Sequence, residues 1–279
     1  MPNLAPMTPF SSIAHSSRPR AFAFGVLALF GGVGLALVGC DGPSAKPDGA
    51  KTEPAVALSY PFPVPQGVAF ADYREVAERN AGIYVRVRVY SDAPEDIGSE
   101  RGSPPASTAL SFASGIIADP RGYVVTPAHV ANSTKYKAEV ILLDGRRYLG
   151  RVVAVERSRE LGLIKIEPFD GMQVARFADG GTLPTGEPTL TIGTPAHHGG
   201  IVSVGTVLRH LKTRISYNDY GYDNAIALAM RIESGNSGGP VLDREGQVVG
   251  MIASNYSADI GLAIPSEDIV SFIHAHTGG

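Results

Sequence analysis

The sequence predicts an all-β protein, built either as a pair of small closed barrels or as a sandwich. Short segments of β-type residues, separated by turn signals, follow one another in two groups through most of the chain. The 279 residues include 33 glycines and 21 prolines, which suits many tight turns and argues against a helical bundle. With 44% hydrophobic and 18% charged residues, the composition is that of an ordinary globular protein.

Charge and cysteine content exclude several kinds of partner. The formal net charge is −3, so the chain has no basic excess with which to bind nucleic acid. A single cysteine forms no internal disulfide and cannot build a zinc site from several thiolates. Most histidines lack carboxylate or cysteine partners at a metal-ligand spacing. We therefore predict no metal, no cofactor and no nucleic-acid partner.

The first 39 residues have the layout of a secretory signal. Two basic residues, Arg18 and Arg20, precede 18 residues without a charge, Ala21–Val38. The apolar run stops beside the only cysteine, Cys40, and this resembles a bacterial lipoprotein signal. In such a signal the cysteine is lipidated and becomes the new N-terminus. The alternative is an uncleaved membrane anchor, because 18 apolar residues nearly span a bilayer.

Either form of the leader predicts a protein of the bacterial cell envelope, anchored in a membrane and facing the periplasm or the exterior. A lipidated Cys40 makes the membrane a partner, since several acyl chains on one cysteine hold firmly. Residues 40–68 then form a proline-rich linker, with six prolines among Gly, Lys, Asp and Ala. We expect this segment to stay extended as a spacer.

Two short helices are expected at the ends of the folded part. Residues 69–80 carry apolar side chains at helical spacing, which predicts a short amphipathic helix. Residues 266–274 predict a C-terminal helix. This helix opens with Ser266 as its cap and has two acidic residues in its first turn.

The residues between these helices predict strands. Ile83–Tyr90 alternates aliphatic side chains with tyrosines and arginines, which indicates a half-buried strand. Turn signals such as Asp144-Gly145 separate the segments that follow. The further expected strands are 110–118, 123–127, 138–143, 146–155, 161–167, 189–193, 202–211, 225–232, 247–254 and 261–264.

The strongest chemical signal is a glycine-rich motif around Ser237, which reads GNSGGP over residues 235–240. A serine hydroxyl is a poor nucleophile until it is exposed, positioned and given a base. Flanking glycines let the backbone turn sharply and let amide groups point together as a pocket for an oxyanion. Six specified residues argue against the alternative, a glycine-rich hairpin turn.

Two further residues complete a candidate constellation. His129 follows the strand that ends at Pro127, and Glu160 leads into the apolar strand that begins at Leu161. Each residue alone is ordinary for a strand end. Together with Ser237 they give the chain order His, carboxylate, Ser, which is one of the known orders of a serine-protease triad.

These features resemble the trypsin-like serine proteases, and most of all their bacterial HtrA/Deg branch. The resemblance covers residues 69–273 and rests on five motifs in family order. They are ASGIIADPRGYVVTPAHV, VILLDGRRYLGRVVAVERSRELGLIKI, TIGTP, GNSGGPVLDREGQVVGMIAS and GLAIPSEDI. The resemblance implies two six-stranded antiparallel β-barrels, 69–168 and 169–279, with the site between them.

The family pattern assigns the triad to His129, Glu160 and Ser237, and the oxyanion donors to the amides of Gly235 and Ser237. The implied activity is hydrolysis of peptide bonds in proteins or peptides outside the cytoplasm, without a cofactor. The family has an aspartate where this chain has Glu160. Because the extra methylene moves the carboxylate by about one carbon–carbon bond, we expect reduced activity. The alternative is a weakened pseudoprotease that serves as a peptide-binding or scaffold protein.

The resemblance also bears on specificity and assembly. It places the walls of the primary specificity pocket at Leu228–Ser234 and Ile252–Asn255, where Arg231 either lines the pocket or faces solvent. The match ends at Ile273, so we expect no PDZ domain to follow. A homo-oligomer would then assemble through the protease part or the N-terminal arm.

Overall fold

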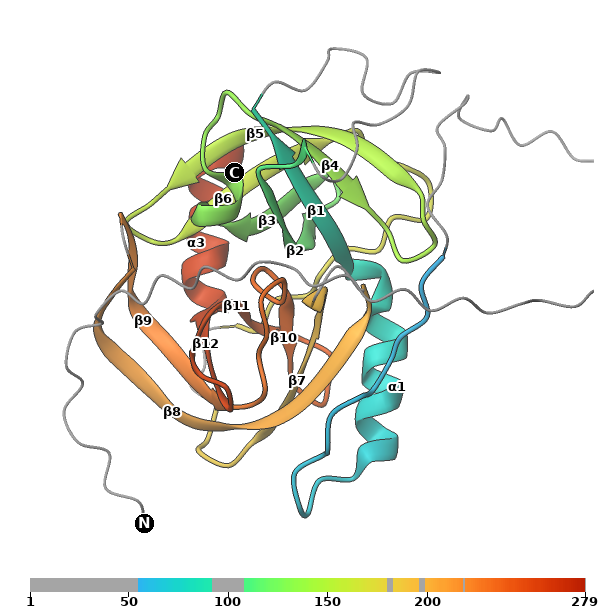
Figure 1. Ribbon diagram of the computed structural model, residues 1–279, viewed down its shortest axis with the longest axis vertical. Helices are drawn as coiled ribbons and strands as arrows, with labels where there is room; N and C mark the ends of the chain where they lie inside the picture. Colours follow the sequence, from blue (N-terminus) through green and yellow to red (C-terminus); the bar gives the residue numbers. More distant parts are fainter. Residues whose placement is uncertain (1–54, 92–107, 180–182, 196–198, 218, 279) are drawn as a thin grey trace, which may run out of the picture. The chain divides into compact units, whose positions relative to one another are not determined.

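Figure 1 shows the computed structural model, which describes residues 55–91, 108–179, 183–195, 199–217 and 219–278. Within these residues the chain forms two closed barrels of six antiparallel strands each. This confirms the all-β class and the pair of six-stranded barrels expected from the sequence. The predicted leader and Cys40 lie outside the described residues.

The N-terminal barrel has the strand order β1-β2-β3-β6-β5-β4 and is closed by pairing of β1 with β4. Its strands are β1 (Tyr84–Tyr90), β2 (Ser111–Asp119), β3 (Tyr123–Pro127), β4 (Lys137–Ile141), β5 (Arg147–Glu156) and β6 (Leu161–Ile166). Aliphatic side chains such as Val87, Val124 and Ile164 fill its interior. Their alternation along each strand turns one face inward, as the sequence pattern predicts.

The C-terminal barrel has the strand order β10-β11-β12-β9-β8-β7 and is closed by pairing of β10 with β7. Its strands are β7 (Pro188–Gly193), β8 (Ile201–Tyr217), β9 (Tyr220–Ala229), β10 (Pro240–Leu242), β11 (Val248–Ser257) and β12 (Ile260–Pro265). Its interior is filled by residues such as Val207, Leu228 and Ile252. The two barrels therefore have separate cores.

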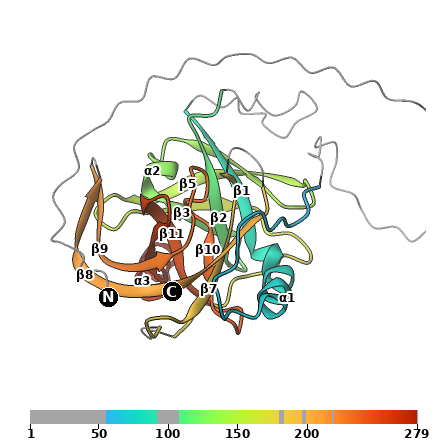
Figure 2. The same cartoon turned by 60° about the horizontal axis from the view of Figure 1, so that its bottom comes forward.

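A third cluster of buried side chains joins the barrels to two helices. Helix α1 (Phe70–Asn80) is followed by the 3-10 turn η1 (Ala81–Ile83), and helix α3 (Ser266–Thr277) ends the described chain. The cluster includes Val76 of α1, Ile116 of β2, Leu190 of β7 and Phe272 of α3. Figure 2 shows α1 beside β7, and α3 contacts β11 and β12.

The burial of β1 differs from the sequence-based prediction. A half-buried strand was expected, but all seven residues are buried. The polar face is covered because the Tyr84 hydroxyl hydrogen-bonds the Thr194 hydroxyl, and Arg88 pairs with Glu139 at 3.1 Å. A charged side chain is buried in this way only when a partner is available.

Several element bounds also differ from the prediction. Strand β10 was missed, and β8 and β9 run further toward each other than the expected 202–211 and 225–232. Ser266 was expected to cap α3, but the residue at the cap position is Pro265. The Ser266 hydroxyl donates instead to the carbonyl oxygen of Ala178 at 3.2 Å.

The described part of the expected linker, residues 55–68, packs against the body of the protein. The Val56 amide donates to the Leu143 carbonyl at 2.6 Å, and the Ser59 amide donates to the Gly200 carbonyl at 2.8 Å. Leu58 and other apolar side chains of this segment contact the shared core. Burying such side chains holds an otherwise extended segment in place. No helix within the described ranges has the length and apolar character that crossing a bilayer requires.

Candidate active site

His129 and Glu160 are brought together by the pairing of β3 with β6. Pro127 at the end of β3 lies opposite Leu161 at the start of β6. His129 was expected just after a strand, and it lies in the short helix α2 (Ala128–Ala131) that follows β3 directly. Because Glu160 immediately precedes β6, the sheet register fixes both residues at one corner of the N-terminal barrel.

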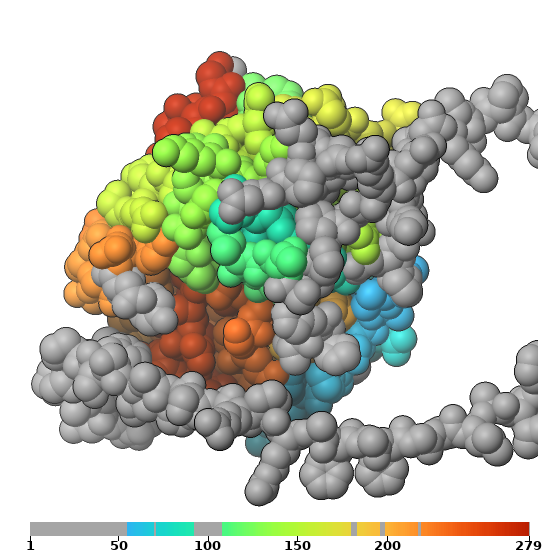
Figure 3. All heavy atoms as spheres, turned by 45° about the horizontal axis from the view of Figure 1, so that its top comes forward, coloured from blue at the N-terminus to red at the C-terminus, as the bar shows by residue number. Residues whose placement is uncertain are grey.

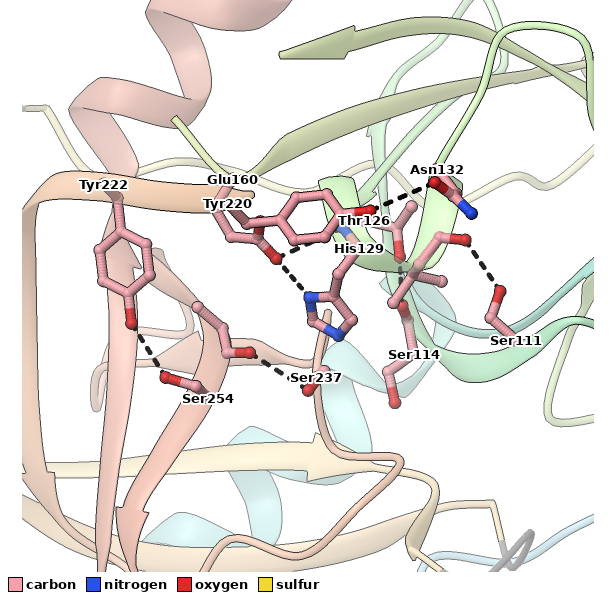
Figure 4. Close-up of polar contacts among 12 residues, drawn as sticks. Ser111, Ser114, Thr126, His129, Asn132, Glu160, Tyr220, Tyr222, Ser237 and Ser254 are labelled. Atoms are coloured by element: carbon pink, nitrogen blue, oxygen red, sulfur yellow. Dashed lines mark hydrogen bonds and ion pairs between the residues drawn. The ribbon is translucent and has the colours of Figure 1, made fainter. Parts of the chain in front are cut away.

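The side chains of His129 and Glu160 form a direct hydrogen bond (Figure 4). Nδ1 of the imidazole donates to Oε1 of the carboxylate, since an ionised carboxylate only accepts. The same oxygen accepts from the His129 backbone amide at 3.4 Å. The Glu160 side chain is 5% exposed and that of His129 is 32% exposed, so the carboxylate is buried while the imidazole is partly open to solvent.

The backbone at Glu160 has an uncommon conformation. Its φ of +56° lies in the left-handed region, which a residue other than glycine occupies only at a cost of about 1 kcal/mol or more. Hydrogen bonds hold the turn: the Glu160 amide donates to the Arg157 carbonyl at 3.4 Å, and the Ala128 amide donates to the Glu160 carbonyl at 3.1 Å. The backbone at this position thus accommodates a glutamate that reaches the imidazole.

Ser237 lies on the C-terminal barrel, in the loop between β9 and β10. Figure 4 places it on the side of the imidazole opposite Glu160. In the described part of the chain its hydroxyl donates to the Ala253 carbonyl at 3.2 Å rather than to the ring of His129. The structure therefore places Glu160 and Ser237 on opposite sides of the His129 imidazole, and the Ser237 hydroxyl points toward β11.

The glycines of the motif let this loop press against β2. Gly235 and Gly238 have φ values of +100° and +89°. A Cβ at Gly238 would lie 1.9 Å from the carbonyl oxygen of Ser114. Only glycine fits at this position, because backbone and backbone are in direct contact there.

Ser114 of β2 anchors the loop at two carbonyl groups. Its hydroxyl donates to the Gly235 carbonyl and its amide donates to the Ser237 carbonyl, both at 2.9 Å. Ser114 is itself fully buried, and its own carbonyl accepts from the Thr126 hydroxyl at 2.9 Å. The sequence analysis missed this residue. A polar side chain inside an otherwise apolar strand is the signal that could have found it.

The remaining groups of the loop leave two amides without an acceptor. The Asn236 and Gly238 amides donate to carbonyl oxygens at 3.1 and 2.7 Å. Among the described residues, the amides of Gly235 and Ser237 have no acceptor. These are the two predicted oxyanion donors. Because the neighbouring peptide groups are hydrogen-bonded, the positions of both amides are fixed.

Three further observations concern the surroundings of the site. Arg231 is exposed, pairs with Glu233 at 3.0 Å and lies 5.4 Å from the ring centroid of Phe62, so it faces solvent. Burial is the main cause that raises the pKa of Tyr222 to about 12, with a further contribution from the charge of Glu160. The described residues contain no group of three His, Cys, Asp or Glu side chains that could hold a metal ion.

A two-barrel fold with a histidine–carboxylate pair on one barrel and a serine-bearing glycine loop on the other defines the trypsin-like class of serine peptidase folds. Consistent with this, residues 113–251 match the family described as "Trypsin-like peptidase domain". Residues 113–251, just under half of the chain, are therefore similar to a trypsin-like peptidase domain.

Proteins of known identity are also similar to this chain. The chain is 34% identical over 207 residues to serine protease HTRA4 of Mus musculus, covering 71% of this chain and 39% of that protein. It is 32% identical over 163 residues to the periplasmic serine endoprotease DegP of Salmonella typhimurium, covering 56% and 34%. The matched part thus spans about two fifths or less of these relatives.

A solved structure of an HtrA-type protease with a tripeptide has the same fold. It superposes with a TM-score of 0.61 at 22% identity, covering 75% of this chain and 63% of that chain.

The anchoring of the loop by Ser114 can be tested without any substrate. In Ser114→Ala the Gly235 carbonyl loses a donor, which weakens the loop by about 1 kcal/mol. We expect the amides of Asn236 and Gly238 to exchange hydrogen several-fold faster, as measured by mass spectrometry of peptides covering 233–240. Ser111→Ala, which removes a hydroxyl bound to the Val130 carbonyl at 2.8 Å, is the matched control on the same strand. Equal exchange in both variants contradicts the anchoring role.

Proposed function

We propose that this chain is an envelope-tethered trypsin-like serine endopeptidase that acts on extracytoplasmic proteins, with reduced activity. The observation that carries the proposal is the hydrogen bond from His129 to the buried Glu160, with Ser237 on the other side of the same imidazole. The similarity to HtrA-like serine proteases supports it. Protein and peptide chains are the proposed substrates.

In the proposed mechanism, the Ser237 hydroxyl attacks the peptide carbonyl and Nε2 of His129 takes its proton. Nδ1 of His129 keeps its proton and donates it in a hydrogen bond to Glu160, whose charge stabilises the imidazolium. The ring then gives the proton to the leaving amine as the C–N bond breaks. Water attacks the acyl-enzyme and gives a proton to Nε2, and the ring returns that proton to Ser237 as the bond to the acyl group breaks. Glu160 fixes the ring in the tautomer that leaves Nε2 free to act as the base.

The amides of Gly235 and Ser237 are the proposed oxyanion donors. Both belong to the loop held by Ser114, so no reorganisation is needed when negative charge develops on the substrate oxygen. Each such donor is worth on the order of 10²-fold in rate in enzymes of this type. This stabilisation does not depend on the nature of the triad carboxylate.

Two observations support reduced activity. The Ser237 hydroxyl must leave the Ala253 carbonyl before it can donate to His129, and such a bond is worth about 1 kcal/mol, or about fivefold in rate. Among the described residues, the second carboxylate oxygen of Glu160 is buried without a hydrogen-bond partner. The same turned-away serine favours the second candidate, a weakened pseudoprotease that binds peptides in the cleft.

Labelling with a fluorophosphonate probe distinguishes the two candidates. An activated serine attacks the phosphorus, so we expect covalent labelling of the intact protein at Ser237 and none after heat denaturation. Ser237→Ala should abolish the label, and Ser257→Ala, at an exposed serine that ends β11, should keep it. An intact protein that stays unlabelled would identify the chain as a peptide-binding scaffold.

The role of Glu160 gives an expectation opposite to the family pattern. Because the backbone conformation accommodates glutamate, Glu160→Asp should withdraw the carboxylate and lower the labelling rate about 10²-fold, although it restores the usual residue. Glu160→Gln should lower the rate on the order of 10⁴-fold, because the tautomer is no longer fixed. Glu156→Gln at the end of β5 is the control. Labelling of Glu160→Asp as fast as the parent contradicts the assigned role.

We propose further that residues 1–39 are a lipoprotein leader and that 40–68 link a lipidated Cys40 to the two barrels, 69–168 and 169–279. Support comes from the sequence pattern and from the periplasmic location stated in the name of the related DegP protein. The proposed site of action is the cell envelope, facing the periplasm or the exterior.

The tether is tested by Cys40→Ala. The parent protein should carry acyl chains on Cys40, begin at that residue and enter the detergent phase on phase separation. Cys40→Ala should stay unprocessed and lose the acyl mass, whereas Ser44→Ala should behave as the parent does. Unchanged processing and partitioning of Cys40→Ala would show a plain membrane anchor instead.

A further inference from the structure

The end of the hairpin formed by β8 and β9 crosses from the C-terminal barrel to the N-terminal barrel. Figure 3 shows this end, in orange, against the yellow-green surface of the N-terminal barrel. The Gly221 amide of β9 donates to the Arg157 carbonyl at 2.9 Å. Arg214 of β8 donates to the Ser158 carbonyl at 2.7 Å. Both acceptors lie in the turn that ends at Glu160.

Tyr220 at the start of β9 contacts the helix that carries His129. Its hydroxyl donates to the side-chain oxygen of Asn132 at 3.2 Å. Its ring stands edge-on to the imidazole, with centroids 6.2 Å apart and planes at 75°. The same ring lies under the guanidinium of Arg157, 4.9 Å from its centroid. Arg157 in turn donates to the carbonyl and side-chain oxygens of Asn132, each at 3.1 Å.

Two strained positions coincide with these contacts. Among the described residues, Asn132 and Glu160 are the non-glycine residues with positive φ, at 60° and 56°. Asn132 ends the helix of His129, and Glu160 ends the turn that holds the triad carboxylate. Strained backbone persists only where its surroundings over-determine it. At both positions the contacts from Tyr220, Gly221 and Arg214 supply part of that restraint.

We propose, on the basis of the function proposed above, that Tyr220 is a positioning residue for the His129–Glu160 pair. It acts through Asn132 and Arg157, and it does not touch the atoms that react. Its hydroxyl fixes the end of α2, and its ring fills the space beside the imidazole. The hairpin end thereby keeps the glutamate turn in the conformation from which Oε1 reaches Nδ1.

The rate of fluorophosphonate labelling at several probe concentrations tests this role. Tyr220→Phe keeps the ring and loses one hydrogen bond, so the maximal labelling rate should fall about fivefold. Tyr220→Ala also loses the ring contact, and the rate should fall about 10²-fold. The probe concentration at half-maximal rate and the final labelled fraction should stay unchanged. A purely structural role would instead lower the labelled fraction.

Tyr148 provides the matched control. It is a half-buried tyrosine near the start of β5, at the end of that strand away from the turn 157–160. Its ring stacks on the ring of Phe169, with 4.3 Å between the centroids. Tyr148→Ala removes the same number of atoms, and its labelling rate should stay within about twofold of the parent, because distant sites act independently. An equal loss in Tyr148→Ala and Tyr220→Ala contradicts a specific positioning role.

A second measurement does not depend on the serine. In Ser237→Ala, the proton shared by His129 and Glu160 should give a low-field NMR signal that is lost in Ser237→Ala/Glu160→Gln. Adding Tyr220→Ala should broaden or remove the signal through faster exchange with water, and adding Tyr148→Ala should not. If the parent protein is not labelled but the NMR signal depends on Tyr220, the proposed function is wrong and the positioning role stands. An unchanged signal in the Tyr220→Ala background overturns the positioning role.

Discussion

The contact between the serine loop and β2 is the constraint on which the site depends. The site is divided between two barrels with separate cores. The relative position of its residues therefore depends on the contact that fixes one barrel against the other. Gly238 meets the Ser114 carbonyl so closely that no side chain fits, and the Ser114 amide and hydroxyl bind both sides of the loop. Backbone packed on backbone leaves little freedom to slide.

The restraint between the barrels is reciprocal. Ser114, a residue of the N-terminal barrel, fixes the loop of the C-terminal barrel that carries Ser237. Tyr220, a residue of the C-terminal barrel, contacts the helix of the N-terminal barrel that carries His129. A shift of either barrel would therefore strain both halves of the site together. Such a division holds groups from different elements in one geometry, which is what proximity catalysis requires.

Local patterns predicted the strands and the chemical groups, whereas tertiary contacts decided the rest. The bounds of β3 follow from its own apolar residues and flanking turns, and the motif around Ser237 is specific in itself. The full burial of β1 depends on partners such as Glu139, which lies 51 residues away along the chain. The hydrogen-bond partners of Ser114 and Tyr220 were not predictable, because each partner lies more than 80 positions distant along the chain. A positive φ at Glu160 likewise leaves no mark in a single sequence.

The glutamate at the proposed triad position reflects an exchange between backbone strain and side-chain length. A left-handed backbone at Glu160 costs about 1–3 kcal/mol of folding stability. A carboxylate misplaced by about 1 Å would cost on the order of 10² in rate, which is about 2.7 kcal/mol of transition-state stabilisation. The two energies are of similar size, but they fall on different properties. The strain lowers stability, which the hydrogen bonds of the hairpin offset, while the barrier to reaction is left unchanged. A longer carboxylate side chain is therefore compatible with catalysis when contacts from the β8–β9 hairpin hold the turn 157–160 in place.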